Sequence, residues 1–435
     1  MSKTFAPVAS LFLGLAFLLC GNGLQTTLTP LRADLEGFSA IQIGLMGSGY
    51  YAGFVLGCLV APYLIAKSGH IRTFAALVSA ASAVALIHPI AIEPVTWVVA
   101  RAVTGFSLAG LYLIIESWLN DRATNENRGF VMSAYIIVSF VTITIGQLLV
   151  TTASIEDFRL FAVASILVSV ATIPVVLTST QQPTPVAIVQ FRPIQLFKVA
   201  PVGLMGSFMI GVANGAFWSL GTLYGTSRGL SANGAAVFMS IAVFGGAVMQ
   251  WPIGRLSDRL DRRLVLAGVM MSATVVGLLL ALLPLGMTGI YIMAALFGMT
   301  TLTSYSVAAA HAYDRADPSA YVEMAAGILL ANGLGSVIGP FSAAALMGAF
   351  GANFLFVFTA GVQLAMLAFI AARTVVRAPT LKAEKETFDV YSAVAVGPVL
   401  SRETFEEEPP AEAEPEPEAD ANVTGDDPSR ADVGG

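Results

Sequence analysis

The sequence predicts an all-α membrane protein with twelve transmembrane helices arranged as two pseudo-symmetric bundles of six. Three observations lead to this fold class. The composition is too apolar for a surface that faces water, and twelve apolar runs each have the length of a membrane-spanning helix. In addition, the second half of the chain repeats features of the first half at an almost constant offset.

The composition separates an apolar body from an acidic tail. Of the 435 residues, 56% are hydrophobic and 11% are charged, whereas an ordinary soluble domain has about 25% charged residues. Residues 380–435 contain fifteen Asp and Glu but four Lys and Arg, so this segment carries −11 and the rest of the chain about +5. The body therefore needs lipid as its surroundings.

Each predicted helix is a run of about 20 apolar residues, which is the length that crosses a bilayer. The first six runs lie near residues 8–30, 41–65, 73–92, 95–118, 129–153 and 159–179. The second six lie near residues 200–224, 233–254, 264–284, 289–310, 321–348 and 354–373. We expect these spans to form the two bundles in chain order.

The connections between the spans predict four regions. We expect an N-terminal six-helix bundle in residues 1–180, a proline-containing cytoplasmic linker in 181–199, and a C-terminal six-helix bundle in 200–375. The tail, residues 376–435, is rich in Glu, Pro and Ala and lacks the apolar content to fold alone. We expect it to be disordered.

The basic residues predict the orientation in the membrane. If both termini are cytoplasmic, the cytoplasmic segments carry fourteen Lys and Arg, whereas the outer loops carry three, at Arg32, Arg159 and Arg228. An excess of basic residues marks the cytoplasmic side of membrane proteins. We therefore expect a multi-pass protein of the bacterial inner membrane with both termini in the cytoplasm.

Short matches between the two halves indicate an internal duplication. Gly21–Gly23 matches Ala213–Gly215, and Gly37–Ala40 matches Gly229–Ala232, both 192 residues later. Further matches at 193 residues pair Asp121–Ala123 with Asp314–Ala316 and Ile145-Gly146 with Ile338-Gly339. A shared register over several spans predicts two related bundles.

The loop between the eighth and ninth spans carries a recognisable motif. Residues 254–263 read GRLSDRLDRR, which resembles the signature loop G-x-L-x-D-R-x-G-R-R of the major facilitator superfamily. The matching positions are Gly254, Leu256, Asp258, Arg259, Arg262 and Arg263, whereas Asp261 stands where the family has glycine. The equivalent loop of the first half is degenerate, with Ala66 in place of the acid. Arg101 and Gly105 resemble a second family pattern, R-x-x-x-G.

The resemblance covers residues 8–375 and implies a secondary transporter of the drug-efflux or sugar-exporter type of bacterial carrier. It implies a central cavity near the membrane midplane that is exposed to alternate sides as one half rocks against the other. It also implies that Asp258 acts as a conformational latch, capping the start of the fifth span near Arg128 when the cytoplasmic end is closed. Gly254, Arg259, Arg262 and Arg263 belong to the same conformational motif.

The fourth span carries the charged residues of the candidate site. Arg101, Tyr112 and Glu116 follow helical spacing and therefore share one face. Glu116 is the acid placed well inside a span, so it is a candidate proton carrier; alternatively, it is a structural partner of Lys67 or Arg72. Arg101 either binds an anionic group or modulates a proton site, or it is a structural arginine near the outer mouth.

Polar residues of other spans complete the candidate cavity. The resemblance implies that the first and seventh spans line it, which brings in Asn22, Gln25, Thr26 and Thr29 from one and Asn214 and Trp218 from the other. Gln147 and Asn332, in the fifth and eleventh spans, are candidates for the rim. The alternative for such amides is hydrogen bonding between packed helices.

These patterns predict a proton-coupled secondary transporter, either an exporter or an importer, of a small organic solute. A non-transporting receptor or scaffold is the alternative, and an integral-membrane enzyme is a weaker one because the three His are dispersed. We expect no enzyme activity, no metal, no cofactor and no nucleic-acid partner. The expected partners are the solute, protons and the bilayer, and we expect a monomer.

Overall fold

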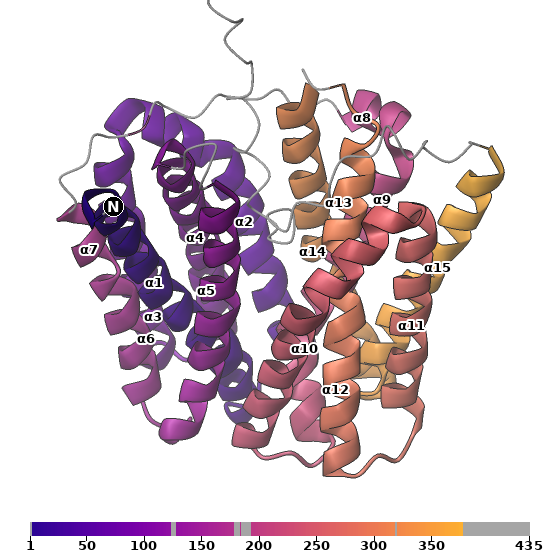
Figure 1. Ribbon diagram of the computed structural model, residues 1–435. Coiled ribbons are helices and arrows are strands. Elements are labelled where there is room, and N and C mark those ends of the chain that lie inside the picture. Colours follow the sequence, from indigo (N-terminus) through magenta and orange to yellow (C-terminus); the bar gives the residue numbers. More distant parts are fainter. Residues whose placement is uncertain (1, 123–127, 178–182, 184–192, 318–319, 377–435) are drawn as a thin grey trace, which may run out of the picture. The chain divides into compact units, whose positions relative to one another are not determined.

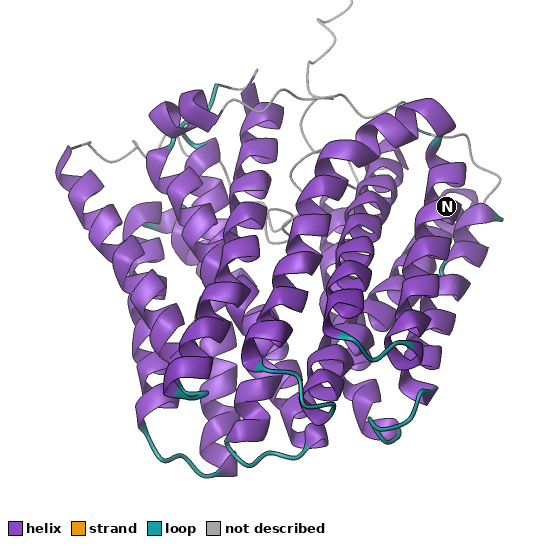
Figure 2. Ribbon diagram, turned by 180° about the vertical axis from the view of Figure 1, so that it is seen from behind, coloured by secondary structure: helices purple, strands orange, loops and turns teal. Residues whose placement is uncertain are grey.

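The structure is a computed structural model that describes residues 2–122, 128–177, 183, 193–317 and 320–376. All regular structure within these ranges is helical (Figure 2). Twelve helices of the described ranges are long and apolar enough to cross a membrane, which confirms the predicted number of spans. Apart from Pro183, predicted linker residues 181–192 lie outside these ranges, as does the predicted acidic tail from residue 377.

The first six spans form one half of the described structure, the N-half (Figure 1). They consist of α1 (Ser2–Leu35), α2 (Ala40–Ser68), α3 (His70–Ile90), α4 (Pro94–Arg122), α5 (Arg128–Leu148) with η1 (Leu149–Thr152), and α6 (Arg159–Val170) with α7 (Thr172–Val176). The first helix is longer than predicted and begins before the apolar run.

The remaining helices form the C-half (Figure 1). They are α8 (Pro193–Val199), α9 (Pro201–Ser227), α10 (Ala232–Arg259), α11 (Arg262–Leu282), α12 (Met287–Thr301), α13 (Ser304–Tyr313), α14 (Tyr321–Phe350) and α15 (Phe354–Val376). The short α8 falls within the predicted linker, and α12 with α13 makes up the tenth span.

Equivalent helices make equivalent contacts in the two halves, as a duplication requires. In the N-half α1 packs on α5 and α6, and in the C-half α9 packs on α14 and α15. The contact of α2 with α4 corresponds to that of α10 with α12. The contacts between the halves are also related, because α2 packs on α14 and α10 packs on α5.

Local structure repeats at the predicted offset of 192 residues. Gly37 and Gly229 adopt φ angles of 78° and 85°, a left-handed conformation that glycine adopts without strain. Two residues later, Ser39 and Ser231 cap α2 and α10, because each side chain accepts a hydrogen bond from the backbone N–H three residues on. The same turn therefore begins the second span of each half.

The apolar core of the described residues consists of three clusters, two of which belong to one half each. The N-half cluster is built from buried residues within 11–19, 61–81, 108–119, 131–136 and 168–175. The C-half cluster is built from buried residues within 196–210, 253–270, 305–312, 324–331 and 366–370. The third, shared cluster combines residues 24–46, 97 and 150–164 with residues 216–242, 276–297 and 343–356. The halves are thus packed together at one end and separately at the other.

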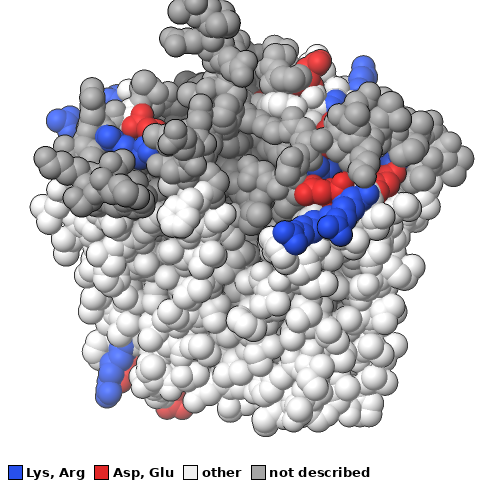
Figure 3. Space-filling model, in the orientation of Figure 1, with Lys and Arg blue, Asp and Glu red and all other residues white. Residues whose placement is uncertain are grey.

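We call the joined end, where α1 finishes and α2 begins, the closed end, and the opposite end the basic end. At the closed end Gly44 lies against Ala344, and Gly47 lies against Ser219. The Thr226 hydroxyl also donates to Asp34 Oδ2 across the halves at 3.3 Å. On the face shown in Figure 3, charged residues gather near the two ends and leave an uncharged band between them, as expected for a surface in contact with lipid.

Candidate functional site

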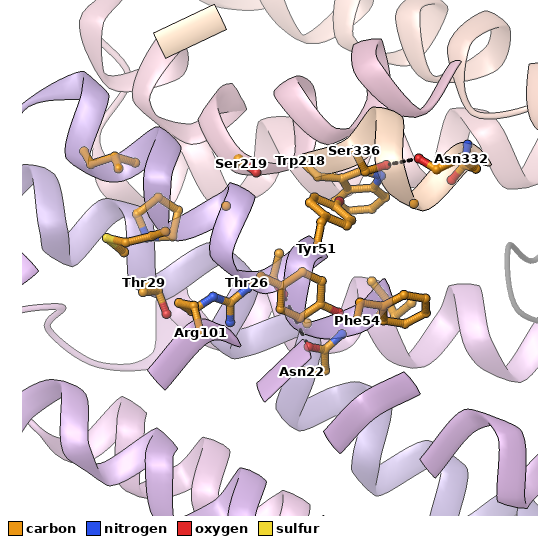
Figure 4. Close-up of a pocket in the computed structure, with 18 of the residues that line it drawn as sticks. Asn22, Thr26, Thr29, Tyr51, Phe54, Arg101, Trp218, Ser219, Asn332 and Ser336 are labelled. Atoms are coloured by element: carbon orange, nitrogen blue, oxygen red, sulfur yellow. Dashed lines mark hydrogen bonds between the residues drawn. The ribbon is translucent and has the colours of Figure 1, made fainter. Parts of the chain in front are cut away.

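A cavity of about 220 Å³ lies between the two halves (Figure 4). A second cavity of similar volume adjoins it, since both are lined by Tyr51, Tyr112, Trp218 and Asn332. The predicted residues that line the first cavity are Asn22, Thr26, Thr29, Arg101, Tyr112, Gln147, Trp218 and Asn332. Asn214 lines the adjoining cavity. The structure therefore brings most of the predicted residues together.

Gln25 is a predicted cavity residue that lines neither of these two cavities. It is 2% exposed and lies on α1 between Asn22 and Thr26. Asn22, Thr26 and Thr29 point along one face at helical spacing, and Gln25 lies at the edge of this face. Its place beside the cavity explains why the same periodicity selected it.

The sequence reasoning missed an aromatic wall on α2. Tyr50, Tyr51 and Phe54 line the cavity, and Figure 4 shows Tyr51 between the N-half wall and Trp218 of the C-half. The equivalent positions of α10, 192 residues later, are Ala242, Val243 and Gly246. This departure from the internal repeat was a usable signal, because packing alone does not require large aromatic residues in one half.

Arg101 is a buried cation in the cavity wall. It is 6% exposed, and its guanidinium carbon lies 4.5 Å from the centre of the Tyr50 ring, within the range of a cation–π interaction. Its Nη1 has no hydrogen-bond partner, and no acidic side chain forms an ion pair with it, within the described ranges. The alternative, a hydrogen-bonded structural arginine near the outer mouth, therefore finds no partner for Nη1 among the described residues.

Glu116 lies four residues beyond Tyr112 on α4 and is completely buried. The Tyr135 hydroxyl of α5 donates to its Oε1 at 2.7 Å, whereas Oε2 has no hydrogen-bond partner among the described residues. Cys58 of α2 and Tyr305 of α13 lie near the carboxyl group. Neither Lys67 nor Arg72 pairs with Glu116 in the described part, so the alternative in which Glu116 is a structural partner of one of these residues is not the arrangement observed.

A row of aromatic side chains lies between Arg101 and Glu116 along this wall. The two residues are fifteen positions apart on one helix, or about 22 Å at 1.5 Å per residue. The Tyr50 ring lies under the Arg101 guanidinium, and the Phe54 ring is 6.4 Å from the rings of both Tyr50 and Tyr112. Aromatic side chains therefore line this wall, although Glu116 itself lines neither cavity.

The amide side chains of the cavity fall into two kinds. Asn332 Nδ2 donates to the Ser207 carbonyl at 3.0 Å, so this amide joins α14 to α9. Gln147 is fully buried, and neither its Oε1 nor its Nε2 has a partner among the described residues. Asn332 therefore fits the helix-packing alternative, whereas Gln147 retains hydrogen-bonding capacity for a ligand.

The signature loop lies at the basic end, between α10 and α11. Arg262 is 1% exposed, and its Nε lies 2.9 Å from Asp314 Oδ2 of the same half. Arg262 Nη2 also lies 3.7 Å from Asp258 Oδ1. Asp261 caps α11, since its Oδ1 accepts a hydrogen bond from the Arg263 backbone N–H at 2.9 Å. The motif residues therefore form a charged cluster that orders this turn.

Comparison with known proteins identifies relatives over most of the chain. The family profile described as Major Facilitator Superfamily matches residues 11–329. The uncharacterized MFS-type transporter YcaD of Escherichia fergusonii is 31% identical over 369 residues, which cover 83% of this chain and 94% of the relative. The uncharacterized MFS-type transporter Ent638_1421 of Enterobacter sp. (strain 638) has the same identity and coverage.

Solved structures share the fold at low sequence identity. A mutant of the nucleoside transporter NupG matches with a TM-score of 0.74 and 13% identity, over 85% of this chain and 100% of that structure. A bacterial homolog of the human lysosomal transporter Spinster, in an inward-facing and occupied conformation, matches with a TM-score of 0.71 and 15% identity. This match covers 87% of this chain and 97% of that structure.

Proposed function

The chain belongs to the major facilitator superfamily of membrane transporters, and on that premise we propose that it is a secondary active carrier that moves a small organic solute by alternating access in exchange for, or together with, protons. The solute would occupy the cavity between the halves. Glu116 would carry the proton.

One observation carries the alternating-access part of the proposal. The shared cluster joins the halves at the closed end, whereas the N-half and C-half clusters are separate at the basic end. Each half thus keeps its own core whichever end is closed. A rocking motion would exchange one set of contacts between halves for another without unpacking either half.

The equivalence of the contacts between halves supports the same motion. The α2–α14 contact and the α10–α5 contact are related by the internal repeat. Glycines at these contacts, such as Gly44 and Gly47, bring the helix backbones close together without interlocking large side chains. Small residues at such interfaces allow close helix approach in membranes.

The environment of Glu116 supports a proton-carrying role. The carboxyl group has one oxygen held by Tyr135 and the other without a partner among the described residues. No cation among the described residues pairs with it, and an unpaired charge inside a membrane is costly. A movement that admits water or a cation to Oε2 would favour release of the proton.

We also propose that the protein lies in the bacterial inner membrane with its basic end in the cytoplasm. The fourteen basic residues of the predicted cytoplasmic segments support this orientation. Reporter fusions after residue 190 and at the C-terminus should both give a cytoplasmic signal. An outer signal from either fusion would contradict the topology.

A reconstituted system tests transport and coupling together. Purified protein is first screened by thermal shift for solutes that stabilise it, and these are then offered to proteoliposomes that contain a pH-sensitive dye. We expect solute addition to move protons, and an imposed pH gradient to drive accumulation. The polarity of the effective gradient distinguishes efflux from uptake.

Glu116→Gln removes the proton site while keeping the shape of the side chain. We expect the variant to exchange solute across the membrane but to fail to accumulate it against a gradient. Glu156→Gln makes the same chemical change in an exposed loop and should behave as wild type. Full accumulation by Glu116→Gln would exclude the coupling role, and a lack of solute flux in wild type would favour a receptor or scaffold.

A further inference from the structure

We infer that the solute is a monovalent organic anion with a flat, largely apolar body, and that Arg101 binds its negative charge. This inference rests on the proposed transport function, because it names the substrate class of the same cavity. Two observations support it. The Arg101 guanidinium is buried and has no acidic partner among the described residues, and aromatic side chains line the cavity around it.

The charge of Arg101 has no partner among the described residues. Its guanidinium is stacked on Tyr50, and Nη1 is buried without a hydrogen bond. A cation removed from water is unfavourable unless it is paired, and stacking on a ring recovers part of that free energy. An incoming anion would recover more, because it supplies both the charge and the hydrogen-bond acceptor.

The groups around Arg101 indicate that the ligand carries a single negative charge. Arg101 lines the first cavity, and no other charged residue of the described part lines this cavity or the adjoining one. The other titratable groups near it are Tyr50 and Tyr51 of α2 and His88 of α3. Tyrosine is ordinarily neutral at pH 7. A single negative charge therefore completes this wall, whereas a cation would be repelled and a dianion would leave excess charge.

The remainder of the cavity is suited to a flat apolar body. Tyr51, Phe54 and Tyr112 of the N-half and Trp218 of the C-half line it, and Figure 4 shows Arg101 and Trp218 on opposite walls with Tyr51 between them. Rings and planar groups pack well against such side chains. Gln147, whose amide has both atoms free of partners in the described part, offers one donor and one acceptor to a polar substituent.

Three matched families of probes test the inference. These are aromatic carboxylates of increasing length (benzoate, phenylacetate and 4-phenylbutyrate), their neutral primary amides and their amines. Binding is measured by calorimetry on the full chain in detergent. We expect at least one carboxylate to bind about tenfold to about a hundredfold more tightly than its amide, which is the range expected for a charge-assisted hydrogen bond, and the amine to bind weakest.

Variants of Arg101 separate charge recognition from a structural role. Arg101→Met should abolish the preference for the carboxylate over the amide, and Arg101→Lys should retain part of it. An unpaired buried cation kept for function lowers stability, so Arg101→Met should keep or raise the melting temperature without ligand. A melting temperature several degrees lower in Arg101→Met would instead show a structural arginine and overturn the inference.

The outcomes also distinguish this inference from the proposed function. Tighter binding of an amide or an amine than of its carboxylate, or no binding of any carboxylate, would overturn the anion assignment. Proton-linked flux of a neutral or cationic solute would leave the transporter proposal standing but contradict the role of Arg101. Carboxylate binding to Arg101 without flux in proteoliposomes would support the binding site and contradict transport.

Discussion

Asp261 stands where the signature loop of the family has glycine, and its contacts give the acid a local role. Burial opposes its charged form, but the Arg263 backbone N–H and guanidinium hold the pKa of the Asp261 carboxyl below its ordinary value. Asp261 is therefore a carboxylate, and caps α11, at all pH values near neutral. A glycine cannot supply this hydrogen bond, so the substitution exchanges backbone freedom for a side-chain cap.

This cap predicts a pH-dependent contribution to stability. We expect Asp261→Ala to lower the free energy of unfolding by about 1 kcal/mol at pH 7. Because the folded pKa is depressed, the contribution is present above the ordinary pKa of about 3.9 and is lost as the pH falls through the folded value. Unfolding in detergent at several pH values measures it.

Asp261→Asn serves as the matched control, because asparagine caps helices about as well as aspartate but does not titrate in this range. It should keep most of the stability at pH 7, and it should lack the wild-type loss of stability at low pH. Equal stability of wild type and Asp261→Ala at neutral pH would show that the cap is unimportant.

Single residues of the cavity were predictable where helical spacing shows which residues share one face of a helix. Asn22, Arg101 and Tyr112 were placed in the cavity from spacing and family resemblance, and the structure puts them there. The contacts that distinguish them were not predictable, because they arise between helices. The guanidinium–ring contact of Arg101 joins α4 to α2, and the hydrogen bond of Glu116 joins α4 to α5.

At the scale of helices, glycines set how closely paired helices approach. A side chain at Gly146 on α5 would collide with the Cys20 carbonyl of α1. In the C-half, a side chain at Gly339 on α14 would collide with the Val212 carbonyl of α9. The two collisions involve equivalent positions of the repeat, so α1 packs on α5 in the same way as α9 packs on α14.

We therefore predict that Gly339→Ala destabilises the protein by about 1–3 kcal/mol, the usual range for overpacking. Gly361→Ala is the matched control, since, apart from the adjoining part of its own helix, no atom of the described residues lies within 4 Å of the position of its new methyl group. It should be neutral or stabilising by up to about 1 kcal/mol, because alanine favours the helix. Melting temperatures in detergent compare the two, and an equal effect of both variants would contradict the packing argument.

The helices themselves were the most predictable feature, because length and apolar content decide whether a segment can span lipid. All twelve spans are present in the described ranges. The details that were missed depend on local hydrogen bonding. The start of α1 at Ser2 and the break between α12 and α13 leave no signal in hydropathy. The short α8 within the predicted linker is likewise too brief to be recognised by periodicity.

At the scale of the whole molecule, the predicted latch role of Asp258 concerns the balance between two conformations, one in which the closed end is packed together and one in which the basic end is. In this structure Asp258 lies beside Arg262 of its own half, as suits a state in which the halves are packed separately at the basic end. When the basic end closes, we predict that Asp258 caps α5 of the N-half. A carboxylate at a helix N-terminus contributes about 0.3–1 kcal/mol, and up to about 2 when partly buried.

Asp258→Asn should therefore shift the population toward the state seen here, while solute affinity stays within a few-fold of wild type. A cysteine at Ser219, which lies in the cavity wall near the closed end, reports this when Cys20 and Cys58 are replaced. Membrane-impermeant labelling from the closed-end side should slow in the variant. Asp317→Asn, an exposed acid at the basic end, is the control, and unchanged labelling in Asp258→Asn would argue against the latch.

Distances measured across both ends of the reconstituted protein test alternating access most directly. Spin labels at Leu35 and Asn233 span the closed end, and labels at Ser68 and Asp317 span the basic end; all four positions are exposed. Each pair is placed in a variant without Cys20 and Cys58 and measured by pulsed electron resonance at pH 5 and pH 8. We predict opposite changes, with one pair lengthening as the other shortens, and no pH response in Glu116→Gln. Distances that stay fixed, or that lengthen at both ends together, would contradict proton-coupled alternating access.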